Sequence, residues 1–279
     1  MFRGFYTVAT GMIAQQRRTE LLSNNITNAN TPGYKADQST IRSFPDMLMS
    51  RMTKSGTNLE SGLNTTANNQ IGALNAGVYM QETLPDYSQG QITATDLTTD
   101  VALVDNQLPT DAETGAKGAI FFRLEHPTEG ETYTRNGNFT LDAQGYLTNA
   151  QGLYVLSDRG QRIQLQNDDY QIMDDGRIIG AGEQEVARIG VSYAAQPDTL
   201  QKQDNGLYRT YNGEDLPSAY TVNGVSFNLK QGYIERSNVD ASKTMTEMLT
   251  AYRAFEANQK VLQAYDRSMD KAVNEIGKV

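Results

Sequence analysis

The sequence of 279 residues contains no cysteine, no tryptophan and a single histidine, His126. Without cysteine the chain can form no disulfide, no thiolate zinc site and no cysteine nucleophile, and one histidine cannot build a histidine-based metal cluster. No segment approaches the run of ~18 apolar residues that a membrane-spanning helix requires. We therefore expect no metal site and no direct insertion into a membrane.

Basic residues are also scarce. The chain has 24 Lys and Arg against 33 Asp and Glu, a formal net charge of −9, whereas proteins that bind nucleic acid normally carry a basic face. Residues 1–40 carry a net charge of +2 and residues 235–279 a net charge of zero, so the acidic excess lies in the middle of the chain. We expect no nucleic-acid partner, and we expect terminal segments that are neutral enough to pack closely.

Sequence motifs for catalysis are missing as well. His126 precedes Pro127 in an expected exposed turn, and the acidic clusters at 167–169 and 174–175 are typical of solvated turns, since the spacing of a calcium-binding loop is absent. The glycines form neither a dinucleotide-binding nor a phosphate-binding sequence. We therefore predict that the protein is not an enzyme and has no catalytic residue and no cofactor.

Apolar residues near the N-terminus recur at alternating spacings of three and four, which predicts an amphipathic helix over residues 3–27. A stretch rich in Asn, Pro and Gly at 28–33 ends this helix. The apolar seam of the helix, on which Gln15 and Thr19 are polar exceptions, consists of Phe5, Val8, Met12, Leu22 and Ile26.

The C-terminal segment holds a heptad pattern for more than four repeats, which is typical of a coiled coil. We expect a helix from Asp240 to Ile276, with Ser237 or Asn238 as its N-terminal cap. Its apolar seam, with two polar interruptions, consists of Met245, Met248, Tyr252, Phe255, Leu262, Met269, Val273 and Ile276.

Each of these helices needs a partner for its apolar face. One amphipathic helix could simply lie on its own domain, but two at opposite ends of a chain most simply pack on each other. Because the C-terminal helix is the longer, the N-terminal helix cannot cover all of its seam. We therefore predict a coiled-coil stalk made by both ends and self-association through its uncovered apolar surface.

The middle of the chain has the pattern of short antiparallel strands. Asn136-Gly137 lies between two alternating runs, which predicts a type I′ hairpin turn, and Gly145 and Gly152 mark further turns. Short, regularly spaced strands are typical of an antiparallel sandwich or barrel. We expect strands at 101–104, 119–124, 162–165, 170–173, 177–179, 188–193 and 207–210.

The predicted fold class is α+β, with discontinuous N- and C-terminal helices in a coiled-coil stalk and a mainly antiparallel β domain in the middle. Residues 53–77 are rich in Asn, Thr and Gly and favour a mobile loop or extended linker. The predicted divisions are 1–35 for the N-terminal stalk helix, 36–94 for an extended linker, 95–215 for the β domain, 216–236 for a return linker and 237–279 for the C-terminal helix.

Both ends of the chain resemble the signatures of bacterial flagellar rod and hook proteins. Residues 21–35, LLSNNITNANTPGYK, are similar to the N-terminal signature N-N-(I/L)-A-N-x-x-T-x-G-(Y/F)-K, and residues 231–240, QGYIERSNVD, are similar to the C-terminal one. The segments 100–103, 121–122 and 133–139 resemble the β domain of the family more loosely. The matched motif residues are Asn24, Asn25, Asn28, Asn30, Thr31, Gly33, Tyr34, Ser237, Asn238, Val239 and Asp240.

The resemblance implies a structural subunit of the flagellar basal-body rod, because hook proteins usually carry an extra domain. Such subunits leave the cell through the flagellar type III export apparatus without cleavage and polymerise helically, with the terminal helices inside and the β domain outside. The implied partners are the protein itself, other rod and hook subunits and the export apparatus, and the implied location is the extracytoplasmic basal body. The first 14 residues have no apolar core of a cleavable signal, which agrees with this route.

Phe44 to Leu48, FPDML, is similar to the element with which the family docks at the export gate, a Phe followed four residues later by an apolar residue. The alternative is that Phe44, Leu48 and Met49 pack on the helices as ordinary linker residues.

Residues 105–109, DNQLP, depart from the glycine-rich run of the family, and residues 110–117 are inserted after them. We expect a locally remodelled β domain, and a proximal or a distal position in the rod both stay open. Two other functions stay open as well. One is a cell-wall or glycan-binding envelope protein on a coiled-coil stalk, whose hydrolytic form would need two carboxylates ~5–9.5 Å apart. The other is a cytoplasmic coiled-coil adaptor.

Overall fold

The computed structural model describes residues 2–45, 47–53, 67–110, 115, 117–128, 130–165, 170–180, 184–203 and 205–276. The chain divides into two compact units, which are described one at a time. The helical unit comprises Met1–Ser23, Gln38–Thr83 and Ser242–Val279, and the β unit comprises Asn24–Asp37 and Leu84–Ala241.

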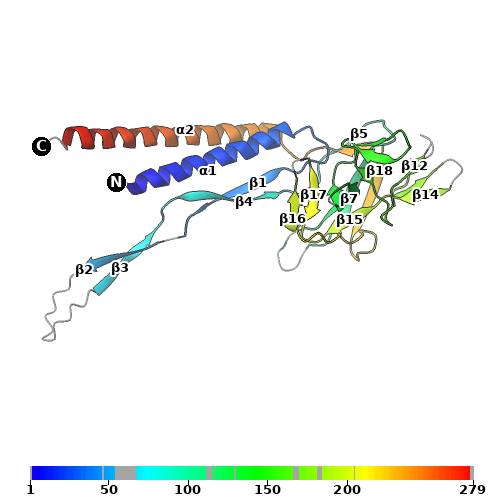
Figure 1. Cartoon of the computed structure of the whole chain (residues 1–279), viewed down its shortest axis with the longest axis horizontal. Helices are drawn as coiled ribbons and strands as arrows, with labels where there is room; N and C mark the ends of the chain where they lie inside the picture. Colours follow the sequence, from blue (N-terminus) through cyan, green and yellow to red (C-terminus); the bar gives the residue numbers. More distant parts are fainter. Residues whose placement is uncertain are drawn as a thin grey trace. The chain divides into compact units, whose positions relative to one another are not determined.

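Two long helices dominate the helical unit. Helix α1 (Phe2–Thr27) begins at the N-terminus, and helix α2 (Ala241–Lys271) continues into a π-helical turn at Ala272–Ile276. Figure 1 shows α1 and α2 running in opposite directions. The prediction of a helix at each end of the chain is therefore confirmed.

Small residues let α1 and α2 approach each other. A Cβ atom added at Gly4 would lie 2.3 Å from the hydroxyl of Tyr265, and one at Gly11 would lie 3.2 Å from Asn258 Nδ2. The two positions on each helix are seven residues apart, so one heptad of α1 lies antiparallel to one heptad of α2.

Two antiparallel strand pairs complete the helical unit. They lie in the segment that the sequence indicated as an extended linker, and β1 begins in the β unit. The pairs are β1 (Asp37–Ser43) with β4 (Val78–Pro85), and β2 (Met47–Thr53) with β3 (Ala67–Leu74).

The β unit is built around one eight-stranded sheet, whose assigned pairings are all antiparallel. Strand β7 lies at its centre and is paired by β8, β11 and β15. The order is β16 (Leu200–Lys202), β17 (Leu207–Thr210), β8 (Gly130–Thr134), β7 (Ala119–His126), β11 (Tyr154–Val155), β10 (Leu147–Asn149) and β9 (Phe139–Leu141), with β15 (Val191–Ala194) added on β7.

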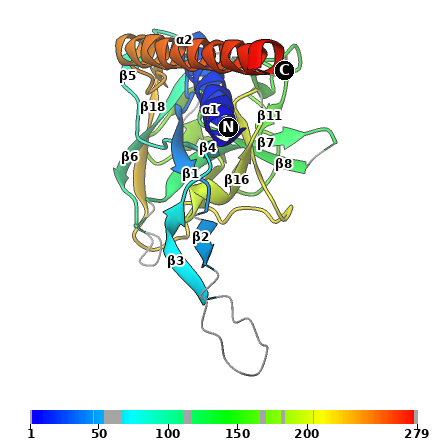
Figure 2. The ribbon, with the colours of Figure 1, turned by 90° about the vertical axis from the view of Figure 1, so that its left-hand side faces the viewer.

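The β unit also contains smaller sheets. In two of them a strand near residue 230 pairs with a strand near residue 100. Figure 2 shows β6 and β18 side by side. The small sheets are β12 (Gln171–Ile172) with β13 (Arg177–Ile179) and β14 (Glu185–Arg188), β18 (Ser226–Gln231) with β6 (Val101–Gln107), and β19 (Tyr233–Glu235) with β5 (Ile92–Ala94). A short 3₁₀ turn at Pro197–Thr199 precedes β16.

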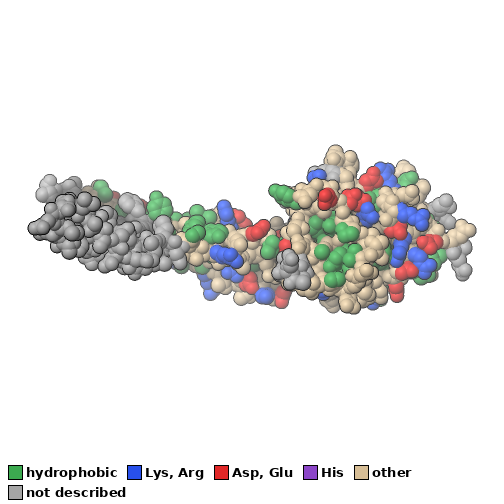
Figure 3. Space-filling view, turned by 90° about the horizontal axis from the view of Figure 1, so that it is seen from below, with side chains coloured by type: hydrophobic (Ala, Val, Ile, Leu, Met, Phe, Trp, Pro, Cys, Tyr) green, Lys and Arg blue, Asp and Glu red, His purple; other side chains and the backbone are tan. Residues whose placement is uncertain are grey.

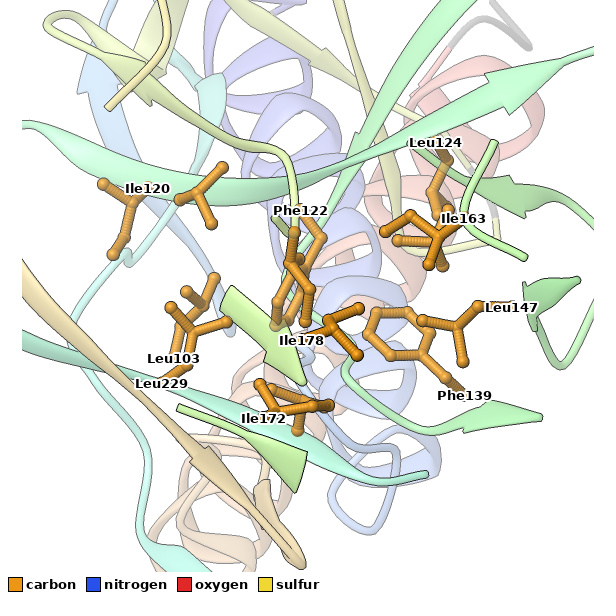
Figure 4. Packing of buried hydrophobic residues seen from close by; sticks show 14 of the residues in the cluster. Leu103, Ile120, Phe122, Leu124, Phe139, Leu147, Ile163, Ile172, Ile178 and Leu229 are labelled. Carbon is orange, nitrogen blue, oxygen red and sulfur yellow. The ribbon is translucent and has the colours of Figure 1, made fainter. Parts of the chain in front are cut away.

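Strand β7 is apolar on both faces because both are covered. Ile120, Phe122 and Leu124 point into the larger core, where the rings of Phe122 and Phe139 meet edge to face at 5.0 Å (Figure 4). Phe121 points the other way, into a second cluster with Tyr208. A strand buried on both sides reads as a continuous apolar run rather than an alternating one.

Charged side chains of both signs lie around a group of hydrophobic ones on the face seen in Figure 3. The α+β class with a mainly antiparallel β region is confirmed.

The predicted hairpin at Asn136-Gly137 is wrong. Strand β8 pairs with β7 and β17, whereas β9 pairs with β10, and neither Asn136 nor Gly137 has the positive φ that a type I′ turn requires. The Gly137 carbonyl instead accepts the Val101 N–H at 2.9 Å. The turns predicted at Gly145 and Gly152 are confirmed, since they join β9 to β10 and β10 to β11 with φ of +83° and +81°.

The role of Gly137 leads to a stability prediction. A Cβ atom there would lie 1.7 Å from the Val101 carbonyl oxygen, so Gly137→Ala forces the backbone of β6 to move and costs about 1–3 kcal/mol as an overpacked site. Urea unfolding of the full chain measures this loss. Gly152→Ala, where no atom lies within 4 Å of the added Cβ, is the control and reports only the cost of a positive φ, about 1 kcal/mol. Equal losses in the two variants would contradict the role given to Gly137.

Candidate functional site

The two terminal signatures meet inside the β unit. We call residues 24–37 and 235–240, which make this meeting, the motif junction. The Gly33 N–H donates to the Glu235 carbonyl at 2.8 Å, and the Asn238 N–H donates to the Tyr34 carbonyl at 3.4 Å. Residues about 200 positions apart in the sequence are thus joined by backbone hydrogen bonds.

The first segment of the junction is shaped by its small and amide residues. Asn28 Nδ2 donates to Asn24 Oδ1 at 2.8 Å, and the Thr31 hydroxyl donates to Asn28 Oδ1 at 3.2 Å. Gly33 has a φ of +68°, and a Cβ there would lie 2.5 Å from the carbonyl carbon of Arg135. Only glycine fits both conditions, which explains the glycine of the motif.

Tyr34 is the buried centre of this segment, with 7 % of its surface exposed. Its hydroxyl donates to Asn24 Oδ1 at 3.1 Å and lies 3.2 Å from Asn25 Oδ1. The Lys202 ammonium lies 4.0 Å from the centre of its ring and donates to Asp37 Oδ1 at 2.8 Å. Burial, and then the charge of Asp37, raise the pKa of Tyr34, so the hydroxyl stays protonated and acts as a donor.

A buried charge cluster of Lys35, Asp105, Arg135 and Glu235 ties the junction to the sheet. Lys35 Nζ donates to Glu235 Oε1 at 2.7 Å, and Arg135 Nε donates to Glu235 Oε2 at 2.6 Å. Arg135 Nη2 donates to Asp105 Oδ1 at 2.7 Å. The cluster contains two cations and two carboxylates, so its net charge is zero.

Three residues of the cluster also make hydrogen bonds to the backbone around them. Glu235 Oε1 also accepts the Gly90 N–H at 2.8 Å, Lys35 Nζ also donates to the Ser88 carbonyl at 2.7 Å, and Arg135 Nη1 donates to the Ile120 carbonyl at 2.8 Å. Side-chain exposure is 2 % for Lys35 and 1 % for Arg135 and for Glu235. A buried pair stabilises a fold only when its geometry and remaining bonds are this complete, and loss of one partner is then costly.

Asn238 is the residue of the C-terminal signature whose side chain binds to the N-terminal segment of the junction. Its Oδ1 accepts the Ala36 N–H at 2.7 Å, and its Nδ2 donates to the Asp86 carbonyl at 2.8 Å. The prediction that Ser237 or Asn238 caps the C-terminal helix is wrong, because α2 begins at Ala241. Ser237 Oγ accepts the Val239 N–H at 3.3 Å, and Asn238 is committed to the junction.

We expect Asn238→Ala to lower the free energy of unfolding by about 1–3 kcal/mol, because it removes the part-buried hydrogen bonds that Asn238 makes to the Ala36 amide and the Asp86 carbonyl. Thermal unfolding of the full chain is the measurement. Asn30→Ala, at an exposed position of the same motif, is the matched control and should change stability by less than about 0.5 kcal/mol. A loss no larger than that of the control would contradict the role of Asn238.

The predicted subunit-packing residues of the helical unit and its boundary fall into three groups. Leu22 is buried, and Phe5, Val8, Met12, Ile26, Met248, Phe255, Leu262 and Met269 are half-buried. Met245, Tyr252 and Val273 are 55 %, 58 % and 72 % exposed. The side chain of Ile276 lies outside the described part of the chain.

The residues of α2 that lie opposite the glycines of α1 belong to a neighbouring line of the heptad, which also holds two buried residues. Ala251 and Thr244 are buried, and Asn258 and Tyr265 lie opposite the glycines of α1. The glycines of α1 leave room for the side chains of α2 at these two points. Of the predicted seam of α2, Met245, Tyr252 and Val273 therefore remain more than half exposed in a single chain, whereas the other four described members are half-buried.

The export-gate candidate lies at the end of β1. Phe44 is 39 % exposed, its ring centre is 5.3 Å from that of Tyr79, and its N–H donates to the Gly77 carbonyl at 3.0 Å. The backbone of Leu48 is in β2, while its side chain is outside the described residues. The docking role of these two residues stays a prediction.

Sequence reasoning missed the buried charge cluster as a unit. Lys35, Arg135 and Glu235 stand inside the stretches that resemble the family, but no spacing in the sequence pairs them. Asp105 belongs to the segment read as a departure from the family pattern, yet it neutralises Arg135. The only signal available was the presence of single charged residues within otherwise polar or apolar motifs.

In the residues that the structure describes, no group of three or more His, Cys, Asp or Glu side chains is arranged to hold a metal ion. Neither of the two long helices, within the same residues, has the length and apolar character needed to cross a membrane.

Three protein-family models match the chain in the order in which its parts occur. "Flagella basal body rod protein" matches residues 5–35, "Flagellar hook protein FlgE/F/G D1 domain" matches 116–180, and "Flagellar basal body rod FlgEFG protein C-terminal" matches 230–275. The first match contains residues 24–35 of the motif junction, the third contains residues 235–240, and the second contains Arg135.

Curated relatives are similar over the whole chain. A flagellar hook-basal body complex protein, FlhO of Bacillus subtilis, is 47 % identical over 279 residues, which is 100 % of both chains. A flagellar basal-body rod protein, FlgG of the same organism, is 31 % identical over 98 % of this chain and 99 % of its own. FlgG of Borreliella burgdorferi is 28 % identical over 98 % of both chains.

Proposed function

The chain belongs to the family of flagellar basal-body rod proteins, and from this premise we propose that it is exported by the flagellar type III apparatus and polymerises helically through its terminal helices. The family is one of structural proteins and not of enzymes, and its members belong to the flagellum. We propose as partners further copies of this chain, other rod and hook subunits and the export apparatus.

The observation that carries the proposal of polymerisation is the apolar face that α2 leaves uncovered. A helix of 31 residues exposes Met245, Leu249 and Tyr252 by 55 %, 52 % and 58 %. Exposed apolar surface of this kind marks a protein–protein contact. We propose that the predicted packing residues bury this face in the polymer, where α1 and α2 form the coiled-coil stalk.

Export and assembly are proposed to be linked through the same surface. A terminal helix with an uncovered face gains its full stabilisation only when a neighbour covers it, so ordering and assembly are coupled. In this scheme Phe44 and Leu48 dock at the export gate without a cleaved signal. The proposed functional divisions are those assigned from the sequence, 1–35, 36–94, 95–215, 216–236 and 237–279.

Immunoblotting of purified hook–basal bodies from the source bacterium tests the rod role, with a deletion strain as the control. We expect the protein in the basal bodies of the parent strain, and rods and hooks missing from the deletion strain. Detection of the protein only in the cytoplasm or free in the wall, together with intact flagella in the deletion strain, would overturn the proposal.

A further inference from the structure

Three exposed apolar residues form a patch on the outer side of α2. Met245, Leu249 and Tyr252 follow each other at intervals of four and three, so they share one helix face, and each has more than half of its surface exposed. We call this set the outer patch. The same face continues with Glu256, Gln259 and Gln263, all exposed, which limits the apolar surface to the first turns of the helix.

Helix α1 carries a matching pair of residues. Tyr6 is 63 % exposed and Ile13 is 49 % exposed. They are seven residues apart and therefore also share one face. Between them, Ala9 lies half-buried. The spacing from Tyr6 to Ile13 equals the spacing from Met245 to Tyr252.

Resting on the function proposed above, we propose that the outer patch binds α1 of a second copy of this chain, antiparallel, with Tyr6 opposite Tyr252 and Ile13 opposite Met245. This register also places Ala9 opposite Leu249. All three exposed residues of the outer patch are then covered by apolar side chains of one helix.

The outer patch is continuous with the contact already made between α1 and α2. From buried Ala251 the apolar surface passes over half-buried Met248 and Phe255 to exposed Met245 and Tyr252. A second α1 would thus extend the contact that the first α1 begins. This continuity favours another copy of the same helix over an unrelated partner.

Charge supports the same register. Arg17 is exposed and follows Ile13 by one turn. In the proposed register it is level with Ala241, the first residue of α2, and Asp240 stands directly before that residue. Arg17 of the second copy thus meets an acidic residue, and the contact gains an opposite-charge pair at one end.

The direction follows from the assembly. One operation repeated along a rod keeps every copy pointing the same way, so α1 of a neighbour runs antiparallel to α2, as α1 does within the chain. Gly4 lies opposite Tyr265 in one chain, which puts Tyr6 level with residue 263. Moving it to the level of Tyr252 displaces the second copy by about 16 Å along the helix, at about 1.5 Å per residue.

Cysteine cross-linking tests this register. Because the chain has no native cysteine, only the introduced cysteines of this chain can form disulfides with each other. Tyr6→Cys with Tyr252→Cys, and Ile13→Cys with Met245→Cys, should each give disulfide-linked multimers after mild oxidation of assembled basal bodies. A disulfide needs Cα atoms within about 7 Å, so a shift of about 16 Å excludes the bond within one chain. Gly11→Cys with Asn258→Cys is the control and should link within one chain, leaving a monomer on a non-reducing gel.

The outcomes separate the register from the rod role. Multimers from Tyr6→Cys with Met245→Cys, in place of the expected pairs, would indicate an inverted dimer and overturn the proposal. No multimer from the expected pairs, with the variants present in basal bodies, would overturn the register and leave the rod role standing. Absence of the unmodified protein from basal bodies would overturn both. If a substitution at Tyr6 or Tyr252 blocks incorporation, Ala9→Cys with Leu249→Cys gives the same reading.

Discussion

Replacement of Glu235 by alanine is expected to lower the free energy of unfolding of the protein by about 3–5 kcal/mol, since removal of one partner of a buried ion pair leaves an uncompensated charge. Glu235 accepts from Lys35 at 2.7 Å and from Arg135 at 2.6 Å, in a place where all three side chains are 1–2 % exposed. The variant would leave both cations facing an apolar methyl group.

Urea unfolding of the full chain, followed by circular dichroism, measures this effect. Glu125→Ala is the matched control, because Glu125 also binds an arginine, Arg162, at 2.6 Å but at a surface position with 37 % of its side chain exposed. An exposed pair contributes about 0–1 kcal/mol. The interpretation of the buried charge cluster fails if the two variants lose the same stability.

Lowering the pH should weaken the contribution of the same buried charge cluster to the unfolding free energy. Burial by itself raises the pKa of Glu235, but the charges of Arg135 and Lys35 outweigh burial and hold that pKa below its usual range. A carboxyl with a lowered pKa in the folded state contributes stability above the pKa of the unfolded chain, about 4.3, and this contribution is lost as the pH falls through the lowered value.

Glu235→Gln removes the titrating group and retains the shape of the side chain. We expect the wild-type protein to lose more of its unfolding free energy than this variant between about pH 7 and about pH 3, because only the wild type releases the contribution of Glu235. Urea midpoints at the two pH values give the comparison. Parallel losses in wild type and variant would show that Glu235 does not titrate across the transition.

Replacement of Phe255 by aspartate is expected to lower incorporation into the rod at least about tenfold, the effect of 1.4 kcal/mol in binding, because a buried, unpaired carboxylate costs more than that. Phe255 is half-buried in a single chain and lies between the residues that face α1 and the outer patch. Leu262→Asp, two turns farther along, should have the same effect.

Swimming motility and immunoblots of purified hook–basal bodies measure the loss. Gln259→Asp is the control, since Gln259 is already polar and exposed on the same helix. Circular dichroism of the purified variants should show the β unit still folded. Normal assembly of the Phe255→Asp variant would contradict burial of the apolar seam between subunits.

Local periodicity determined the elements whose signal lies within a few neighbouring residues. A stripe at spacings of three and four produced α1 and α2, and turn glycines at 145 and 152 were placed correctly because a positive φ is a local requirement. The pair Asn136-Gly137 has the same local sequence pattern of a turn but does not form a hairpin turn. Its glycine is needed for the approach of the Val101 carbonyl, a residue from a distant strand.

The limits of the helix prediction have a similar cause. Asn238 has the chemistry of a helix cap, but its side chain is hydrogen-bonded instead to Ala36 and Asp86, which lie far away in the sequence. The heptad stripe of α2 predicted which residues are apolar and share a face. It did not predict that Thr244 and Ala251, on the neighbouring line, would be the buried residues of the helix.

The sequence by itself determined the class of the fold, the helix at each end, the β character of the middle and the family, because each depends on composition, period or a contiguous motif. Only the tertiary structure decided that Lys35, Asp105, Arg135 and Glu235 form one neutral buried cluster and that Met245, Tyr252 and Val273 of the α2 seam stay exposed. Both depend on contacts between segments up to 200 residues apart, and charges separated that far leave no mark in local sequence.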